Sequence, residues 1–254
     1  MFRPVCAWGL FPTLILTREV LPMKQYPETI ENAWDVLYRD YPEIYDTFAS
    51  FPYQPSVLQV VGERFDLVGK TVLDVGAGGG QSALPVARYA AQVIGVEPEA
   101  AMRAAAEQSA REHGVENVSF LAGSAEAIPL LGGAVDIVMA ITAPLAVDEA
   151  LRVVRRPGLL LQVGIAPNWY GGELDPIILD PAPELEATSR DLTEHHGFSV
   201  IDFESVQDYG THDNILRTYG FIFGRRAIAH LRQTGQTAIR WRFRIHYRWV
   251  ESVL

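Results

Sequence analysis

The chain has 254 residues, 48% of them hydrophobic, and a formal net charge of -10. This composition indicates a folded chain of one generous domain rather than a disordered one. An acidic balance does not suit a protein that grips phosphate backbones, which needs clustered Lys and Arg, so we expect no nucleic-acid partner. The single cysteine, Cys6, excludes an intramolecular disulfide and a cysteine-based metal cluster. We therefore expect no metal site and a reducing, cytoplasmic location.

Residues 1–22 are interpreted as an N-terminal extension of uncertain status. Residues 5–16 are mostly apolar and follow Arg3, which leaves a targeting or membrane segment open as an alternative. Pro12 interrupts this run, and no small-x-small cleavage site follows it. The run is also shorter than the ~20 residues that span a bilayer. We expect no membrane partner.

Residues 23–69 are predicted to form a helical cap. Within them, residues 28–50 carry apolar and aromatic side chains at a spacing that roughly follows one helical face. Pro42 is expected to divide this segment into two helices, because a proline interrupts the hydrogen bonds of a helix interior.

From residue 70 onward, short apolar segments alternate with helical patterns. The predicted strands are 71–75, 92–96, 118–121, 135–141 and 159–165, and the predicted helices are 81–91, 99–113 and 147–155. Strands that are apolar throughout and alternate with helices are typical of a parallel sheet covered on both faces. The pattern predicts an α/β, doubly wound fold over residues 70–254.

The last third of the chain has a different pattern. Residues 168–183 are rich in Gly and Pro and are predicted to be a long loop, followed by helices at 184–196 and 214–233 and a strand at 198–206. Residues 239–249 alternate strictly between apolar side chains and Arg or His. Period two predicts an antiparallel strand near the sheet edge with one solvated face. The alternative is that the arginine row binds an anionic ligand.

A glycine-rich segment follows the first predicted strand. Asp74 ends the strand, and Gly76, Gly78 and Gly80 follow it. Glycines allow a sharp turn and a close approach of a ligand to the backbone. The dinucleotide pattern Gly-x-Gly-x-x-Gly fails because its sixth position is Gln81. A carboxylate at Asp74 would also repel a pyrophosphate, whereas it suits a ligand that carries an ammonium and a sulfonium.

Residues 74–80 resemble the first motif of the Rossmann-like (class I) S-adenosylmethionine-dependent methyltransferases, in particular the type 11 small-molecule group. The resemblance implies a mostly parallel seven-stranded sheet with an antiparallel C-terminal strand, and S-adenosylmethionine as cofactor. It also implies that Asp74 organises the methionine end of the cofactor. Gly76, Ala77, Gly78 and Gly80 would form the loop against which the cofactor lies.

Later segments extend the resemblance as far as residue 165. Glu97, followed by Pro98, ends the second strand about twenty residues after the loop, where a carboxylate accepts both ribose hydroxyls. Ser124 and Ala125 lie where the family has an Asp and an Ala beside the adenine, so the adenine contact departs from the family pattern at Ser124. Residues 135–138 and 155–158 resemble the fourth-strand motif and the turn before the fifth strand. Ala140, on the fourth strand, and Tyr45, in the cap, complete the candidate cofactor site; alternatively, Tyr45 belongs to the core.

No motif identifies the methyl acceptor or a general base. The segment after the fourth strand lacks the Asn/Asp-Pro-Pro-aromatic sequence of enzymes that methylate amide or exocyclic nitrogen. His212, in a predicted loop, is a weak candidate for the catalytic base. The other histidines are expected at helix ends or surface positions: His113, His195, His196, His230 and His246. Trp169 and Tyr170 follow the fifth strand, on the side of the crevice. They would form an aromatic wall or lid of the acceptor site, or have a purely structural role.

The sequence therefore predicts a methyltransferase that acts on a small-molecule acceptor, with an acceptor region around residues 166–235. An NAD(P)-dependent oxidoreductase is the alternative enzyme. A non-catalytic member of the fold, acting as a binding module, is the alternative outside enzymes. The oligomeric state is left open.

Deletion of residues 1–22 is expected to leave a folded protein that still binds S-adenosylmethionine, because no family element precedes the predicted cap. Calorimetry on the shortened and the full chain measures this. Insolubility or lost binding would show that the extension packs on the domain or directs its location.

Overall fold

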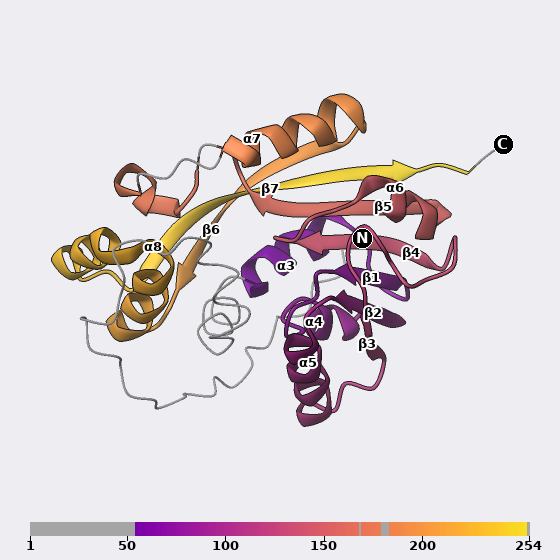
Figure 1. The fold of residues 1–254 in the computed structure, drawn as a ribbon, viewed down its shortest axis with the longest axis horizontal. Coiled ribbons are helices and arrows are strands. Elements are labelled where there is room, and N and C mark those ends of the chain that lie inside the picture. Colours follow the sequence, from indigo (N-terminus) through magenta and orange to yellow (C-terminus); the bar gives the residue numbers. More distant parts are fainter. Residues whose placement is uncertain (1–53, 168, 179–182, 253–254) are drawn as a thin grey trace, which may run out of the picture.

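The computed structural model describes residues 54–167, 169–178 and 183–252 (Figure 1). The predicted extension, the predicted cap helices over 28–50 and Tyr45 lie outside these residues. Within them, no helix is long and apolar enough to cross a membrane.

A seven-stranded sheet organises the molecule, in the order β3-β2-β1-β4-β5-β7-β6. Strands β1 to β5 run parallel, and β7 is antiparallel to both β5 and β6. Their bounds are β1 Thr71–Val75, β2 Gln92–Glu97, β3 Val118–Ala122, β4 Val135–Ile141, β5 Val154–Ile165, β6 Ser199–Asp208 and β7 Ala238–Val250. The predicted doubly wound, mostly parallel sheet with an antiparallel C-terminal strand is confirmed.

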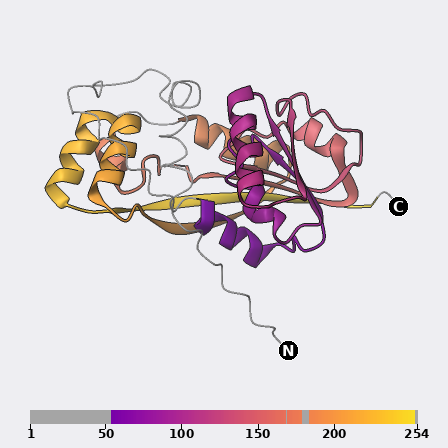
Figure 2. The same cartoon turned by 90° about the horizontal axis from the view of Figure 1, so that it is seen from below.

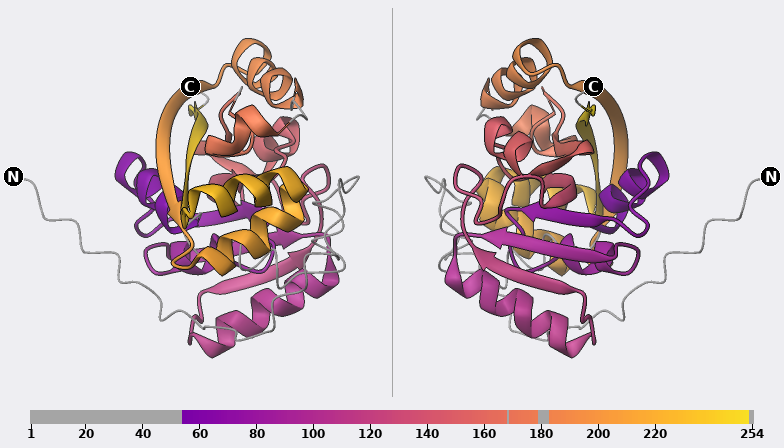
Figure 3. Two further views of the ribbon diagram at one scale, coloured as in Figure 1. Left: turned by 90° about the vertical axis from the view of Figure 1, so that its left-hand side faces the viewer. Right: turned by 90° about the vertical axis from the view of Figure 1, so that its right-hand side faces the viewer.

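Helices cover both faces of the sheet, which explains why its central strands are aliphatic throughout. Side chains on one face of β1, β4 and β5 form a core with α3 (Gln54–Arg64) and α4 (Ala83–Ala87). Those on the opposite face pack against α6 (Val147–Val153) and η4 (Asp191–His195). Helix α5 (Ala100–Glu112) packs on β3, and α7 (Pro183–Arg190) continues into η4. Figure 3 shows α5 and α7 at opposite ends of the molecule.

Strands β6 and β7 form a ribbon that extends beyond the parallel strands (Figure 2). Pairing of β5 with β7 stops at Ile165 and Phe243, whereas β6 stays paired with β7 as far as Asp208 and Ala238. The projecting part of the β6–β7 ribbon packs against α8 (His212–Thr234) and the short 3-10 helix η3 (Gly172–Ile177). There the Trp241 indole nitrogen donates to the Tyr219 hydroxyl at 2.6 Å. Burial of these two large side chains anchors the ribbon.

Several predicted boundaries differ from the observed ones. The helix predicted over 81–91 is the shorter α4, and the helix predicted over 147–155 ends at Val153. The turn predicted at 155–158 lies within β5, which begins at Val154 and has a register shift against β4. The predicted loop at 168–183 contains η3. Strand pairing and local turns set these boundaries, and the hydrophobic pattern of the sequence does not predict where such pairing begins or ends.

The final strand confirms the alternation but corrects the interpretation of its second face. That face is not uniformly solvated, because His246, predicted at the surface, is only 4% exposed. Arg240, Arg242 and Arg244 are exposed or half-buried, and each lies within 4.0 Å of a carboxylate oxygen, from Glu173, Glu204 and Asp202 respectively. These ion pairs balance the charges of three of the four arginines in this strand.

Gly95 in β2 lies close to the loop after β1 and to Phe120 of β3. A Cβ at this position would lie 2.5 Å from a ring carbon of Phe120 and 2.9 Å from the Cβ of Ala77. Gly95→Ala is therefore expected to lower the free energy of unfolding by about 1–3 kcal/mol through overpacking. Urea denaturation measures this change in the free energy of unfolding. Gly132→Ala is the matched control, since its Cβ would meet only a backbone oxygen at 3.3 Å; equal effects of the two changes would contradict the prediction.

Candidate active site

The candidate site lies where the carboxyl ends of β1, β2 and β4 meet. Strands β1 and β4 are neighbours in the sheet, although the chain passes through β2 and β3 between them. Such a reversal of strand order opens a crevice at the carboxyl edge, where α/β proteins bind ligands. The predicted cofactor residues of the loop after β1, of the end of β2 and of the segment after β3 are all brought to this edge.

The loop after β1 is held by backbone hydrogen bonds to β2. The amides of Gly76 and Ala77 both donate to the carbonyl of Val96, at 2.8 and 3.1 Å, and Gly80 N donates to Ala77 O. Gly76, Gly78 and Gly80 have φ values of 70°, 54° and 89°, in the left-handed region that favours glycine. These residues adopt a conformation that other side chains would strain.

Glu97 is bonded directly to this loop. Its Oε2 accepts from Gly78 N at 3.0 Å, and its Oε1 accepts from Glu99 N at 3.0 Å. The side chain is buried, with 6% of the residue exposed. Arg103 braces the same turn by donating to the carbonyls of Glu97 and Pro98, at 2.7 and 2.6 Å. The loop and the second-strand carboxylate, which the sequence placed in one site by spacing, are thus in contact.

Asp74 is fully buried at the end of β1. Its Oδ2 accepts from the Ser82 hydroxyl at 2.5 Å, and its Oδ1 has no hydrogen-bond partner among the described residues. Burial raises the pKa of Asp74 to about 7; the Ser82 hydrogen bond opposes this rise, and the negative charge of Glu97 adds to it. A buried carboxylate oxygen without a donor is costly, and a cationic or N–H-bearing ligand would remove that cost.

The remaining cofactor candidates contribute mainly backbone or shape. Ser124 is half-buried and forms a single bridge with Ala127, next to the buried Ala125. Ala140 is fully buried within β4, opposite Gln162 of β5. Pro98 is exposed beside Glu97.

Thr142, directly after β4, has an unusual backbone. Its φ is 51°, which a β-branched residue rarely adopts. Two hydrogen bonds hold it, from Thr142 N to Val163 O at 2.7 Å and from its hydroxyl to Ile141 O at 2.8 Å. Strained residues of this kind gather at functional sites. The sequence analysis considered this segment but had no signal for the strain.

A cavity of about 440 Å³ adjoins the turn after β4. It lies between that turn, β5 and the α7–η4 helix, and its lining residues are Ala143, Pro144, Leu145, Gln162, Ala187, Thr188, Asp191 and Leu192. Ala143 connects it to the loop, because a Cβ on Gly76 would lie 2.5 Å from the Cβ of Ala143. Gln162 was not among the residues predicted from the sequence, although a polar residue within the apolar run Leu159–Val163 was a usable signal.

The weak acceptor-site candidates have partners in the part of the chain that follows β5. His212 is the first residue of α8 rather than part of a loop, and its Nδ1 is 3.0 Å from Gln236 O, at the far end of the β6–β7 ribbon. The guanidinium of Arg242 stacks over the Trp169 ring, with its Cζ atom 4.7 Å from the ring centre. Tyr170 packs edge-on against Phe223 of α8. Over the described ranges, no group of three or more His, Cys, Asp or Glu could hold a metal ion.

Comparison with known proteins identifies the domain. Residues 72–158, from β1 into β5, match the family model described as "Methyltransferase domain". The chain is 35% identical over 141 residues to the uncharacterized methyltransferase YcgJ of Bacillus subtilis, covering 50% of this chain and 54% of YcgJ. The chain thus spans about half the length of this curated relative.

Other curated relatives match shorter segments. Identity to a ubiquinone biosynthesis O-methyltransferase of Azorhizobium caulinodans is 35%, over 36% of each chain. A 23S rRNA (uracil(1939)-C(5))-methyltransferase of Aeromonas hydrophila is 51% identical over 49 residues, which are 19% of this chain and 11% of that protein.

Solved structures show the same fold at low sequence identity. The crystal structure of YcgJ superposes with a TM-score of 0.54 and 20% identity, covering 79% of this chain and 100% of that one. A SAM-dependent methyltransferase from Aquifex aeolicus gives 0.53 and 17%, covering 87% and 100%. Residues 72–158 thus match a methyltransferase domain, and the chain has the Rossmann-like fold of the solved methyltransferase structures.

The raised pKa of Asp74 makes the stability of the cofactor-free protein depend on pH. Its pKa is about 7 in the folded state against 3.8 for the free group, so the folded state holds the proton more tightly. Its contribution to stability is full below about pH 4 and is lost as the pH rises to about 7, by up to about 4 kcal/mol. Asp74→Asn is expected to remove this loss. Urea denaturation of both proteins from pH 5 to 8 tests it; parallel pH profiles would contradict it.

Proposed function

We propose that this protein transfers a methyl group from S-adenosylmethionine to a small-molecule acceptor. One arrangement carries the proposal: a buried Asp74 with an unpartnered oxygen stands beside a glycine loop whose Gly78 amide is bonded to Glu97. A negative site of this kind suits a ligand with positive charge and two ribose hydroxyls better than it suits a pyrophosphate.

In this proposal each end of the cofactor meets a different strand. Asp74 faces the ammonium and sulfonium end, and the backbone of Gly76, Ala77, Gly78 and Gly80 lies against the ligand. Glu97 accepts hydrogen bonds from the ribose hydroxyls, a charge-assisted contact. Pro98, Ser124 and Ala125 border the adenine, Ala140 supports the floor, and Tyr45 covers the methionine end from the predicted cap.

When bound, S-adenosylmethionine would supply an electrophilic methyl group; the acceptor would form a bond to that methyl carbon as the bond to sulfur breaks, and the leaving group would be a neutral thioether. The work of the chain is to align the acceptor and to exclude water. The strained Thr142 and the adjoining cavity mark the acceptor side, where Ala143 contacts both the loop and the cavity. A base is needed only when the acceptor carries a proton. None of the described residues is assigned that role.

A small acceptor fits the chain better than a nucleic acid does. The net charge is -10, and the cavity of about 440 Å³ is of the size that holds a small organic molecule. Part of its lining, from Ala187 to Leu192, belongs to the acceptor region expected at 166–235. The domain division into residues 1–22, 23–69 and 70–254 and a cytoplasmic location complete the proposal.

Isothermal calorimetry with three ligands tests the function. We expect binding of S-adenosylmethionine and of S-adenosylhomocysteine and no binding of NADPH. Binding of NADPH alone would support the oxidoreductase alternative. Binding of S-adenosylmethionine without turnover across a broad panel of small acceptors and RNA would support a non-catalytic module, and turnover of RNA alone would overturn the small-molecule assignment.

Gly78→Val is expected to abolish binding of S-adenosylmethionine while the protein stays folded. Two methyl groups would occupy ligand space at a position with φ 54°. Gly114→Val is the matched control, because Gly114 has a similar φ of 63° and lies outside the site, with open space around its Cβ. Calorimetry measures affinity, and circular dichroism measures folding. Unchanged affinity in folded Gly78→Val would show that this loop does not hold the cofactor.

A further inference from the structure

The floor of the cavity carries a buried amide with unused donors. Gln162 of β5 is 8% exposed and lines the cavity. Its Oε1 lies 2.7 Å from Nδ1 of His246, whereas its Nε2 has no hydrogen-bond partner in the part of the chain that the structure describes. Because Gln162 lines the cavity, a ligand or water there can accept from this nitrogen.

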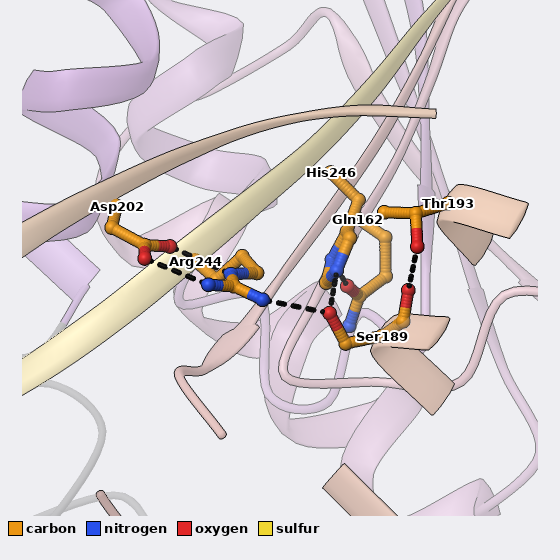
Figure 4. A network of polar contacts seen from close by, with 6 residues as sticks. All are labelled: Gln162, Ser189, Thr193, Asp202, Arg244 and His246. Atoms are coloured by element: carbon orange, nitrogen blue, oxygen red, sulfur yellow. Dashed lines mark hydrogen bonds and ion pairs between the residues drawn. The ribbon is translucent and has the colours of Figure 1, made fainter. Parts of the chain in front are cut away.

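A chain of hydrogen bonds fixes which way this amide points (Figure 4). Arg244 donates to both carboxylate oxygens of Asp202, at 2.7 and 2.8 Å, and to the Ser189 hydroxyl at 3.0 Å. Ser189 Oγ lies 2.9 Å from Nε2 of His246. Ser189 accepts from the guanidinium, which only donates, and its own hydrogen is available to Nε2; Gln162 Oε1 can only accept, so it requires the hydrogen on Nδ1 and leaves Nε2 as the acceptor.

His246 then has a defined tautomer. Burial, together with the positive charge of Arg244, lowers the pKa of His246 to about 4, and the nearby Asp202 opposes that shift. The imidazole is therefore neutral at pH 7, with Nε2 accepting from Ser189 and the hydrogen on Nδ1. Nδ1 donates to Gln162 Oε1, so the amide nitrogen is left for the cavity. Gly164 leaves room for that nitrogen, since a Cβ there would lie 3.1 Å from it.

We propose that Gln162 is the polar anchor of the acceptor pocket, and that its amide hydrogens bind a neutral carbonyl or hydroxyl oxygen of a compact, otherwise apolar acceptor. The inference rests on the proposed function for the meaning of the pocket. His246, Ser189 and Arg244 are positioning residues, since they hold the amide in one orientation and do not line the cavity.

The lining determines the chemistry of the ligand. Its apolar members are Ala143, Pro144, Leu145, Ala187 and Leu192. Among the described residues, Asp191 is the one charged member of the lining, and no cationic side chain lines the cavity. An anionic ligand would therefore meet the Asp191 carboxylate, which lies 3.0 Å from His195 and 3.5 Å from His196, whereas a neutral oxygen meets an oriented N–H donor. A ligand without an acceptor oxygen would leave the buried amide unpaired, which is the stronger source of discrimination.

Three small probes of similar size test this assignment: acetophenone, ethylbenzene and benzoate. Each is titrated into the full chain, labelled with ¹⁵N and saturated with S-adenosylhomocysteine, while the side-chain amide resonances are followed by NMR. We expect acetophenone to bind about tenfold more tightly than either other probe, the factor of one neutral hydrogen bond. We also expect it to shift the Gln162 amide.

Variants separate the anchor from its positioning residues. Gln162→Leu is expected to remove the preference for acetophenone over ethylbenzene and to leave the affinity for ethylbenzene unchanged. Ser189→Ala is expected to weaken the preference and to broaden the Gln162 amide resonances, because the imidazole and the amide lose their fixed orientation. Thr193→Val is the matched control on the same helical segment, since the Thr193 hydroxyl bonds only to backbone carbonyls.

The outcomes separate this inference from the proposed function. Equal binding of acetophenone and ethylbenzene by wild type, or no response of the Gln162 amide, would overturn the anchor even if S-adenosylmethionine binds. If the chain binds no S-adenosylmethionine, the titration is repeated without S-adenosylhomocysteine. A preference for acetophenone that depends on Gln162 would then support the anchor and reject the methyltransferase proposal. If Gln162→Leu does not fold, the wild-type and Ser189→Ala measurements still decide the question.

Discussion

The site depends on the attachment of the loop after β1 to the end of β2. The Val96 carbonyl receives two amides of the loop, and the Glu97 carboxylate receives the amide of Gly78. These bonds form only between parallel neighbours that end at the same edge, because the carboxyl ends of both strands must face the crevice. A glycine backbone with positive φ reaches this position at little conformational cost. The turn after β4 then packs on the same loop through Ala143.

Two buried carboxylates lie beside that loop and favour the positively charged ligand that we propose for it. Asp74 and Glu97 repel each other, and this repulsion adds to the effect of burial on the pKa of Asp74. Ser82 satisfies one oxygen of Asp74, and among the described residues the other has no donor. In the free protein the arrangement is held at some cost, which a cationic ligand relieves through charge-assisted hydrogen bonds.

The acceptor side uses the opposite strategy, with polar groups that satisfy one another inside the protein. Asp202, Arg244, Ser189, His246 and Gln162 come from four elements, and one pair of amide hydrogens remains for the cavity. A buried network of this kind specifies one orientation, because reversing any member leaves a donor or acceptor unpaired. In our proposal the cofactor side thus selects charge, and the acceptor side selects a neutral oxygen.

The sequence alone determined the parallel strands, the glycine loop, Asp74 and Glu97, because each depends on neighbours close in the chain or on a fixed spacing. It also identified the alternation of residues 239–249. It could not place His246 inside the protein, because α7 and η4, which come earlier in the chain, cover that face of β7 only after folding. The left-handed Thr142, the place of His212 at the end of the ribbon and the pairing of Gln162 with His246 likewise depend on contacts between distant segments. Local pattern records which residues face the same way; only the tertiary structure decides what lies opposite them.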